Sequence, residues 1–194
     1  MTDITSESAR GRRGPAPPER PARRPGEGRA RDELIACAEL FFFAYRDFTG
    51  DPDVVLAQYG FGRAHHRVLH FVQRNPGLRV ARLLDILKIT KQSLARVLKQ
   101  LLDEGFITQK TGPEDRRERL LFATTKGTKL AEKLASLQLQ RISTALENAG
   151  PGGSDATIRF LLGMIGDADR PAVEALIKQG RSAATSKKAG EKSS

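Results

Sequence analysis

A set of hydrogen-bond donors gathers between residues 91 and 100. Apolar side chains recur there at helical spacing and form one stripe, which predicts an amphipathic helix: Leu94, Val97, Leu98, Leu101 and Leu102. The opposite face of that helix carries side chains that can donate hydrogen bonds to bases or phosphates: Lys91, Gln92, Ser93, Arg96, Lys99 and Gln100. One apolar face and one face of donors is the arrangement a helix needs to read a nucleic acid.

The first turns of this helix hold the residues that we expect to contact DNA. A helix in the major groove contacts base edges near its N-terminus. Gln92 can form two hydrogen bonds with adenine and Arg96 two with guanine, each worth about 1 to 3 kcal/mol of discrimination. Lys99 lies further along the same face. The residues better suited to holding phosphates are Thr90, Lys91 and Ser93.

A second candidate site is the basic tip of a predicted hairpin. Apolar runs at residues 106–110 and 119–123 favour two short strands, and the segment TGPEDRRE connects them. Arg116 and Arg117 in that segment can enter a narrow minor groove, where the negative potential is enhanced. A charged tip alone is equally compatible with a solvated turn, so the DNA interpretation depends on the helix that precedes it.

Two further helices must position the donor-bearing helix. Residues 62–74 show helical apolar spacing and end at the breaker Asn-Pro-Gly. The spacing then repeats from Val80 over about nine residues, and Thr90 can cap the following helix through its hydroxyl. Gly105 is suited to end that helix. Three helices followed by a hairpin predict a winged helix-turn-helix.

Apolar helices are predicted on both sides of this unit. Residues 32–48 are apolar on more than one face, which indicates that the helix packs against a partner. The sequence Gly-Asp-Pro-Asp at residues 50–53 is expected to end it. A long helix should span residues 125–148, and a last helical region over residues 155–179 should break at Gly166.

The sequence LLDILKITKQSLARVLKQLLDEGFI, followed by GPEDRRERLLFATTKG, resembles the MarR (multiple antibiotic resistance regulator) family of bacterial transcription factors. The resemblance is close over residues 61–127, and its most specific part is the Asp-Arg-Arg wing tip. Thr124 and Gly127 match the end of the family pattern Leu-Thr-x-x-Gly, with Ala123 in place of leucine. Lys88 also departs, because the family commonly has glycine in that turn. A left-handed backbone there would cost lysine about 1 kcal/mol relative to glycine.

The resemblance implies a mainly α fold with a small β wing (α+β). A winged helix-turn-helix at about residues 61–125 would be flanked by N- and C-terminal dimerisation helices, at about 32–48 and 125–179, in one domain over residues 31–180. It further implies that Asp115 orients an arginine instead of touching DNA.

The resemblance also implies an obligate homodimer on double-stranded DNA, with one helix of each subunit in the major groove and the wing in the minor groove. Two apolar clusters, at residues 41–43 and 161–165, support this independently, because a two-fold dimer lets them meet across subunits. The alternative is that both clusters complete the core of a single chain.

The net charge of +10 is distributed unevenly. Residues 1–31 and 178–194 each carry +4, and the tails 1–30 and 181–194 are predicted to be basic and disordered because they hold few large apolar side chains. Residues 32–62 carry −5, whereas residues 63–119 carry +7. The basic charge of the predicted domain therefore lies on its helix-turn-helix and wing.

Several classes of protein are disfavoured. No run approaches the roughly eighteen apolar residues of a membrane helix, and residues 1–30 lack the apolar part of a secretory signal, so we expect a cytoplasmic protein. The sequence motifs of phosphate-binding loops, serine hydrolases and zinc proteases are missing, so neither an enzyme nor a cofactor is predicted. A winged-helix protein-interaction module remains the alternative, although such a surface would expose apolar anchors where this chain has donors.

Regulation is left open between several mechanisms. By resemblance, a small phenolic or carboxylate effector could lie between the dimer helices and the winged domain, and Arg46 could either meet such an anion or pair with a neighbouring acid. Cys37, the single cysteine, could sense oxidants as in peroxide-responsive members, or pack as a small apolar side chain. His66 and His70 lie one helical turn apart, but no cysteine or carboxylate in that helix completes a metal site.

Overall fold

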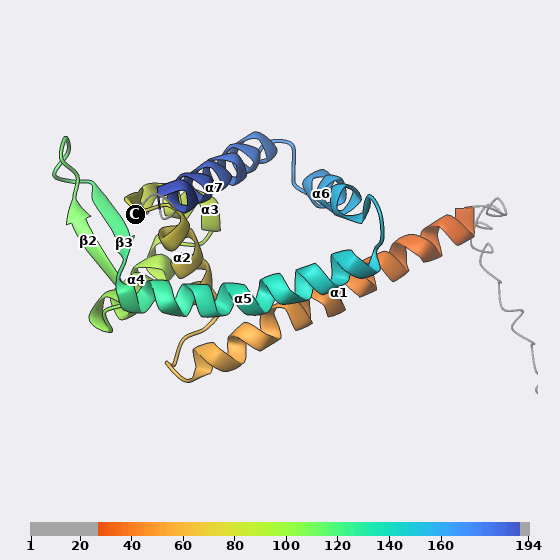
Figure 1. Ribbon diagram of the computed structural model, residues 1–194, viewed down its shortest axis with the longest axis horizontal. Helices are drawn as coiled ribbons and strands as arrows, with labels where there is room; N and C mark the ends of the chain where they lie inside the picture. The colour runs from red at the N-terminus through yellow and green to blue at the C-terminus, as the bar shows by residue number, and fades with distance from the viewer. Residues whose placement is uncertain (1–26, 191–194) are drawn as a thin grey trace, which may run out of the picture. The chain divides into compact units, whose positions relative to one another are not determined.

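A computed structural model describes residues 27–190 of the chain (Figure 1). Of the basic tail predicted to be disordered over residues 1–30, residues 1–26 lie outside this range. Residues 27–30 are helical instead, because they extend an existing helix. Contacts within the chain divide it after Phe42. In the first unit, the described residues belong to α1 (Glu27–Ala57), and its side chains from residue 30 to residue 42 are all exposed. The second unit holds the remainder of α1 and every other described element.

The second unit contains the predicted winged helix-turn-helix. Its elements are α2 (Arg63–Arg74), β1 (Leu78–Arg79), α3 (Val80–Leu87), α4 (Lys91–Asp103), β2 (Ile107–Thr111) and β3 (Arg119–Ala123). Three antiparallel strands form a sheet in the order β1-β3-β2. In Figure 1 the β2–β3 hairpin extends from the group of helices formed by α2, α3 and α4. The predicted mainly α fold with a small β wing is confirmed, although β1 was not predicted.

One hydrophobic core joins these elements. The stripe predicted on α4 is buried at Leu94, Val97 and Leu101, and it meets Leu69 of α2 and Leu83 of α3 in the same cluster. Burying each such leucine stabilises the fold by roughly 1.5 to 3 kcal/mol. The apolar stripe thus determines which face of α4 remains outside.

The C-terminal elements follow the predicted pattern. They are α5 (Thr125–Asn148), α6 (Gly153–Gly163) and α7 (Arg170–Gly190). The break expected at Gly166 falls between α6 and α7. However, α7 continues through residues 181–190, where a disordered tail was predicted. The sequence there has no proline, and extending an existing helix avoids the cost of nucleating a new one.

The end predicted for the first helix at residues 50–53 is wrong, because α1 passes through Pro52 and reaches Ala57. Proline cannot donate the helical hydrogen bond to the carbonyl of Phe48, four residues earlier. The side-chain amide of Gln138 in α5 donates to that carbonyl instead, at 3.4 Å. Pro52 and Leu56 are also fully buried, so tertiary packing offsets the local disruption.

Side chains of both apolar clusters are exposed. Phe42 and Phe43 are 71% and 56% exposed, and Leu161 and Met164 are 45% and 55% exposed. None of the described helices is long and apolar enough to cross a membrane.

Candidate nucleic-acid interface

The start of α4 is fixed by a hydroxyl cap. Thr90 Oγ1 accepts a hydrogen bond from the backbone N–H of Ser93 at 3.1 Å, and it donates to Ser93 Oγ at 2.9 Å. The predicted cap is thereby confirmed. Because Thr90 uses its own proton in this pair, the proton of the Ser93 hydroxyl remains able to point outward to an acceptor.

The outer face of α4 keeps some of its donors free. Lys91, Gln92 and Arg96 are exposed, and within residues 27–190 their side chains form no hydrogen bond or ion pair. Lys99 instead pairs with Asp103 one turn later. The unpaired donors therefore lie in the first two turns of the helix, where a helix in the major groove approaches base edges.

Gln100 belongs to a different network, which joins α4 to the start of α2. His65 Nδ1 accepts the backbone N–H of Gly62 at 3.1 Å, so its proton lies on Nε2, which donates to Gln100 Oε1 at 2.9 Å. The Gln100 amide then donates to Glu104 at 3.2 Å. Burial lowers the pKa of His65 and so favours this neutral form. Gln100 thus serves packing between helices.

The hairpin tip is ordered by hydrogen bonds that leave its two arginines free. Asp115 accepts the backbone N–H of Arg117 at 2.8 Å, and the guanidinium of Arg119 donates to the carbonyl of Arg116 at 2.9 Å. Both Arg116 and Arg117 are exposed, and neither guanidinium has a partner among the described residues. Asp115 therefore contacts the backbone of an arginine and shapes the tip.

The helix-turn-helix and the wing line one groove of about 550 Å³. Val80 and Leu84 of α3, Lys91 of α4 and Arg117 of the wing all border it. One free cation of α4 and one of the wing, predicted from two separate parts of the sequence, therefore face a common space.

The junction between the wing and α5 explains one of the family signatures. Thr124 Oγ1 caps α5 by accepting the N–H of Gly127 at 3.1 Å, and it donates to the carbonyl of Gly105 at 2.7 Å. A Cβ on residue 127 would overlap the carbonyl oxygen of Phe106. The Thr-x-x-Gly pattern is thus a cap followed by a close approach of two backbones.

The turn between α3 and α4 has the left-handed backbone considered above. Lys88 has φ +51° and ψ +43°, and it is the only residue other than glycine with positive φ in the described range. Its ammonium group pairs with Asp169, just before α7, at 3.1 Å.

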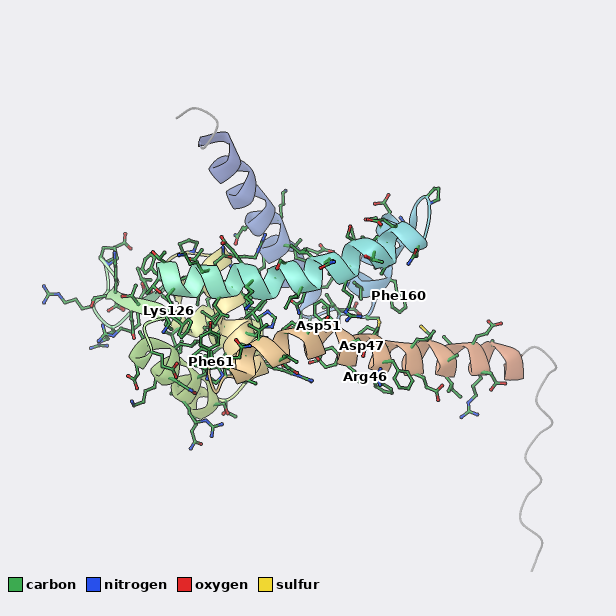
Figure 2. All side chains as sticks on the ribbon, turned by 60° about the horizontal axis from the view of Figure 1, so that its bottom comes forward. Arg46, Asp47, Asp51, Phe61, Lys126 and Phe160 are labelled. Atoms are coloured by element: carbon green, nitrogen blue, oxygen red, sulfur yellow. The ribbon has the colours of Figure 1, made fainter. Side chains whose placement is uncertain are left out.

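The other candidate residues lie apart from this interface. Cys37 is exposed on α1, and so it is not buried within the single chain. Arg46 is exposed and pairs with Asp47 at 2.8 Å, and both lie on the same helix in Figure 2. Among residues 27–190, no group of three or more histidine, cysteine or carboxylate side chains could hold a metal ion.

The fold and this arrangement define a winged helix-turn-helix protein. The model of the MarR family matches residues 59–118 of the chain. The HTH-type transcriptional regulator PetP of Rhodobacter capsulatus is 50% identical over 120 residues, which are 62% of this chain and 72% of that protein. The chain therefore belongs to the MarR family and is a transcriptional regulator of this type.

Solved structures show the same fold at lower identity. A MarR transcriptional regulator from Methanosarcina mazei Go1 has a TM-score of 0.54 and 24% identity, over 69% of this chain and 93% of that one. S. aureus MepR, in a structure described as its DNA-binding conformation, has a TM-score of 0.57 and 19% identity, over 66% of this chain and 94% of that one.

Proposed function

We propose that this regulator binds double-stranded DNA sequence-specifically as a homodimer, with α4 in the major groove and the β2–β3 hairpin in the minor groove. One observation carries the proposal: Lys91 of α4 and Arg117 of the wing, two cations without a partner in the described chain, border a single groove. Gln92 and Arg96 would contact bases, and Thr90, Lys91 and Ser93 would hold phosphates. Lys99 would either leave Asp103 and contact DNA or remain at the edge of the interface.

The charge distribution supports the same surface. The net +7 of residues 63–119 attracts phosphates, whereas the −5 of residues 32–62 lies on the preceding segment. A protein-interaction module would present apolar anchors on α4, but its outer face is polar. Binding to chromosomal DNA also agrees with the expected cytoplasmic location.

The wing assignment is tested with Arg117→Ala. We expect operator affinity, measured by fluorescence anisotropy on a site found by genome-wide footprinting, to fall at least several-fold, because a minor-groove cation is lost. Thermal stability should not change, since the guanidinium has no partner in the described chain.

Lys133→Ala is the matched control, because it removes one exposed cation from α5, outside the groove. Wild-type protein that fails to bind any DNA, even at low salt, would refute the function itself. Arg117→Ala with wild-type affinity would refute only the role of the wing.

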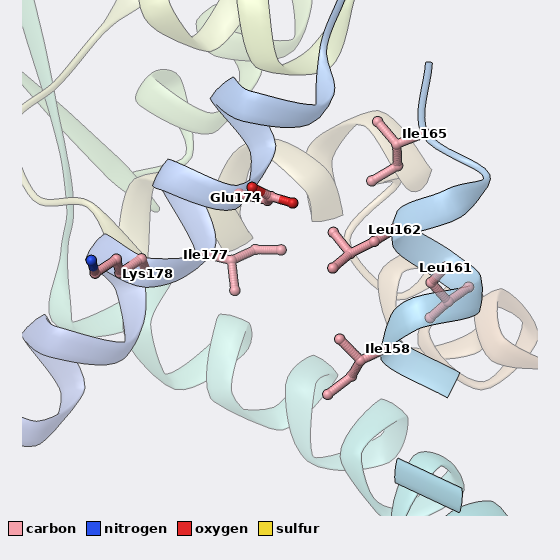
Figure 3. A pocket seen from close by; sticks show the side chains of 7 residues that line it. All are labelled: Ile158, Leu161, Leu162, Ile165, Glu174, Ile177 and Lys178. Carbon is pink, nitrogen blue, oxygen red and sulfur yellow. The ribbon is translucent and has the colours of Figure 1, made fainter. Parts of the chain in front are cut away.

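Homodimer formation follows from the exposed apolar surfaces. In the first unit, α1 exposes Leu34 and Phe42, at 71% each. In the second unit, α6 and α7 border an apolar groove of about 400 Å³, into which Ile158, Leu162 and Ile177 point (Figure 3). A partner subunit would remove such surfaces from water, whereas a monomer would leave them exposed.

An anionic effector would fit a pocket of about 530 Å³ between α2 and its neighbours. Tyr45 and Phe48 of α1 provide aromatic walls, and Arg63 and Arg67 of α2 provide positive charge. Burial lowers the pKa of His66 in the same pocket, so the arginines supply the charge at neutral pH. A small aromatic carboxylate matches this lining, whereas Arg46 does not border the pocket.

Arg67 could connect such an effector to DNA binding. Its guanidinium donates to the carbonyl of Leu87, the last residue of α3, at 3.1 Å. A carboxylate that drew Arg67 into the pocket would release this carbonyl next to the turn before α4. Titration with salicylate, used as a probe of this ligand class, should therefore lower the DNA affinity of the wild type and not that of Arg67→Gln.

A further inference from the structure

The wing is joined to the helix-turn-helix by little backbone pairing. β1 contributes only Leu78 and Arg79, which pair with Leu121 and Leu120 of β3. Beyond that point the hairpin continues to its tip without a further strand on this side. Since the hairpin must keep a fixed position relative to α4 in order to reach two grooves at once, an additional attachment would matter.

A side-chain contact extends the attachment by two residues. Arg79, the residue before α3, places its Nη1 3.1 Å from the carboxylate Oε1 of Glu118, the last residue before β3. The side chain of Glu118 is only 28% exposed, whereas that of Arg79 is 61% exposed. The pair thus bridges the start of α3 and the loop at the tip of the wing.

The loop is built closely around Glu118. Its carbonyl accepts the N–H of Gly112 at 3.1 Å, and its N–H donates to the carbonyl of Asp115 at 3.0 Å. Gly112 is buried, and a Cβ there would lie 3.0 Å from the Cβ of Glu118 and 2.9 Å from the Asp115 oxygen. The backbone therefore holds the Glu118 carboxylate towards Arg79.

The charge of Glu118 alone does not explain why a carboxylate occupies this position. Glu118 borders the same groove as Lys91 and Arg117, where an anion opposes the approach of phosphates. It also neutralises Arg79, which would otherwise be free to attract DNA. The Glu118 carboxylate therefore weakens the attraction to all DNA. Its contact with Arg79 also fixes the position of the wing relative to the helix-turn-helix.

We propose that Glu118 and Arg79 are positioning residues, which fix the wing relative to α4 and thereby raise the preference for the operator over other DNA. This inference rests on the proposed function, because it concerns the two-groove contact. Charge and position make opposite predictions for Glu118→Gln. Loss of an anion strengthens binding to every sequence, whereas loss of the attachment weakens only the contacts that need the correct geometry.

The test compares operator and random-sequence DNA in anisotropy titrations at one salt concentration. For Glu118→Gln we expect random-DNA affinity to rise or stay constant and the operator-to-random ratio to fall about three- to fivefold, the scale of one partly exposed ion pair. Glu114→Gln is the matched control: the same charge is removed from an exposed acid of the same loop that has no partner in the described chain. Its ratio should remain at the wild-type value.

Two further measurements separate positioning from general destabilisation. Hydroxyl-radical footprints of Glu118→Gln should lose protection where the wing lies. Protection of guanine N7 in the major groove, measured by dimethyl sulfate methylation, should persist. Arg79→Gln should lower the ratio to a similar extent, and the double variant should lower it no further than either single change.

Equal ratios for the Glu114 and Glu118 variants, or losses that multiply in the double variant, would overturn the inference. A wild-type protein that binds no DNA would instead overturn the proposed function. Circular dichroism melting of each variant ensures that folded proteins are compared.

Discussion

At the scale of single residues, Lys88 shows that a local preference can be overruled. Its left-handed backbone favours glycine, and the ion pair with Asp169 is too exposed to offset more than a small part of the cost. The turn is dictated by its position between α3 and α4, whose buried leucines require the chain to reverse there. The residue therefore adopts the conformation that the packing of its neighbours needs.

Lys88→Gly should accordingly stabilise the protein by about 0.5 to 1 kcal/mol, as measured by urea unfolding. Lys129→Gly, at an exposed position inside α5, should have the opposite effect and destabilise by about 1 kcal/mol. Destabilisation by both substitutions would contradict the strain assigned to Lys88.

Asp115 illustrates a second point at this scale. The family resemblance implies that it orients an arginine, and in the structure its carboxylate bonds to the backbone N–H of Arg117. The guanidinium is therefore left free to contact DNA, and its direction is set through the main chain. Spacing alone does not distinguish a side-chain partner from a backbone partner.

At the scale of elements, α2 packs against both α4 and the long helix α5. His70 of α2 is half-buried, beside Phe71 and close to the cationic Arg74. Burial, reinforced by the charges of Arg74 and His66, lowers the pKa of His70 to about 4. The folded protein therefore keeps this imidazole neutral at neutral pH.

This shift predicts a pH-dependent stability. Because the pKa of His70 is lower in the folded than in the unfolded chain, the unfolded chain binds more protons between about pH 6.5 and pH 4. The free energy of unfolding should be constant above this window and fall as the pH drops through it, by about 1 to 2 kcal/mol at pH 5.

Urea unfolding at pH 7 and pH 5 measures the difference, and NMR titration of the His70 ring measures the pKa itself. His70→Gln should remove most of the loss, whereas His66→Gln, which retains His70, should keep most of it. A His70 ring that titrates near pH 6.5 in the folded protein would falsify the prediction.

Helix α1 shows why the end of a helix is difficult to predict from neighbouring residues. Gly50 and Pro52 are helix breakers in isolation, but Gln138, ninety residues later, replaces the missing backbone donor at Phe48. The pattern of residues near Pro52 does not reveal such a distant partner. In contrast, the Thr90 cap was predicted correctly, because its signal lies within three residues. The cap at Thr124 was not predicted, although the same residue matches the family pattern.

At the scale of the whole molecule, the unpaired apolar surfaces predict the assembly. Phe42 is 71% exposed, and a two-fold axis would bury it once in each subunit. A buried phenylalanine contributes roughly 1.5 to 3 kcal/mol. Replacing Phe42 by a charged residue should therefore weaken the dimer at two positions, one in each subunit.

Phe42→Asp should raise the dimer dissociation constant at least tenfold in sedimentation equilibrium, with the helical circular dichroism signal of the folded chain retained. Gln58→Asp adds the same charge at an exposed polar position and should leave the dissociation constant unchanged. A wild type that sediments at the 21.3 kDa of one chain would refute the dimer itself.

The features predicted correctly from the sequence have local causes. Apolar spacing located α2 to α5, the Thr90 cap located the start of α4, and the wing tip and Thr-x-x-Gly pattern identified the family. Each signal lies within a few residues because helical period, capping and turn geometry act over that distance.

Contacts between distant residues form only in the folded chain. The Gln138 amide donates to the carbonyl that Pro52 leaves without a donor, Arg79 pairs with Glu118 in the wing loop, and Arg67 reaches the end of α3. In the fold, Lys91 of α4 and Arg117 of the wing border one groove. These contacts join residues far apart in the chain, and their formation depends on the packing of the core, which no local pattern encodes.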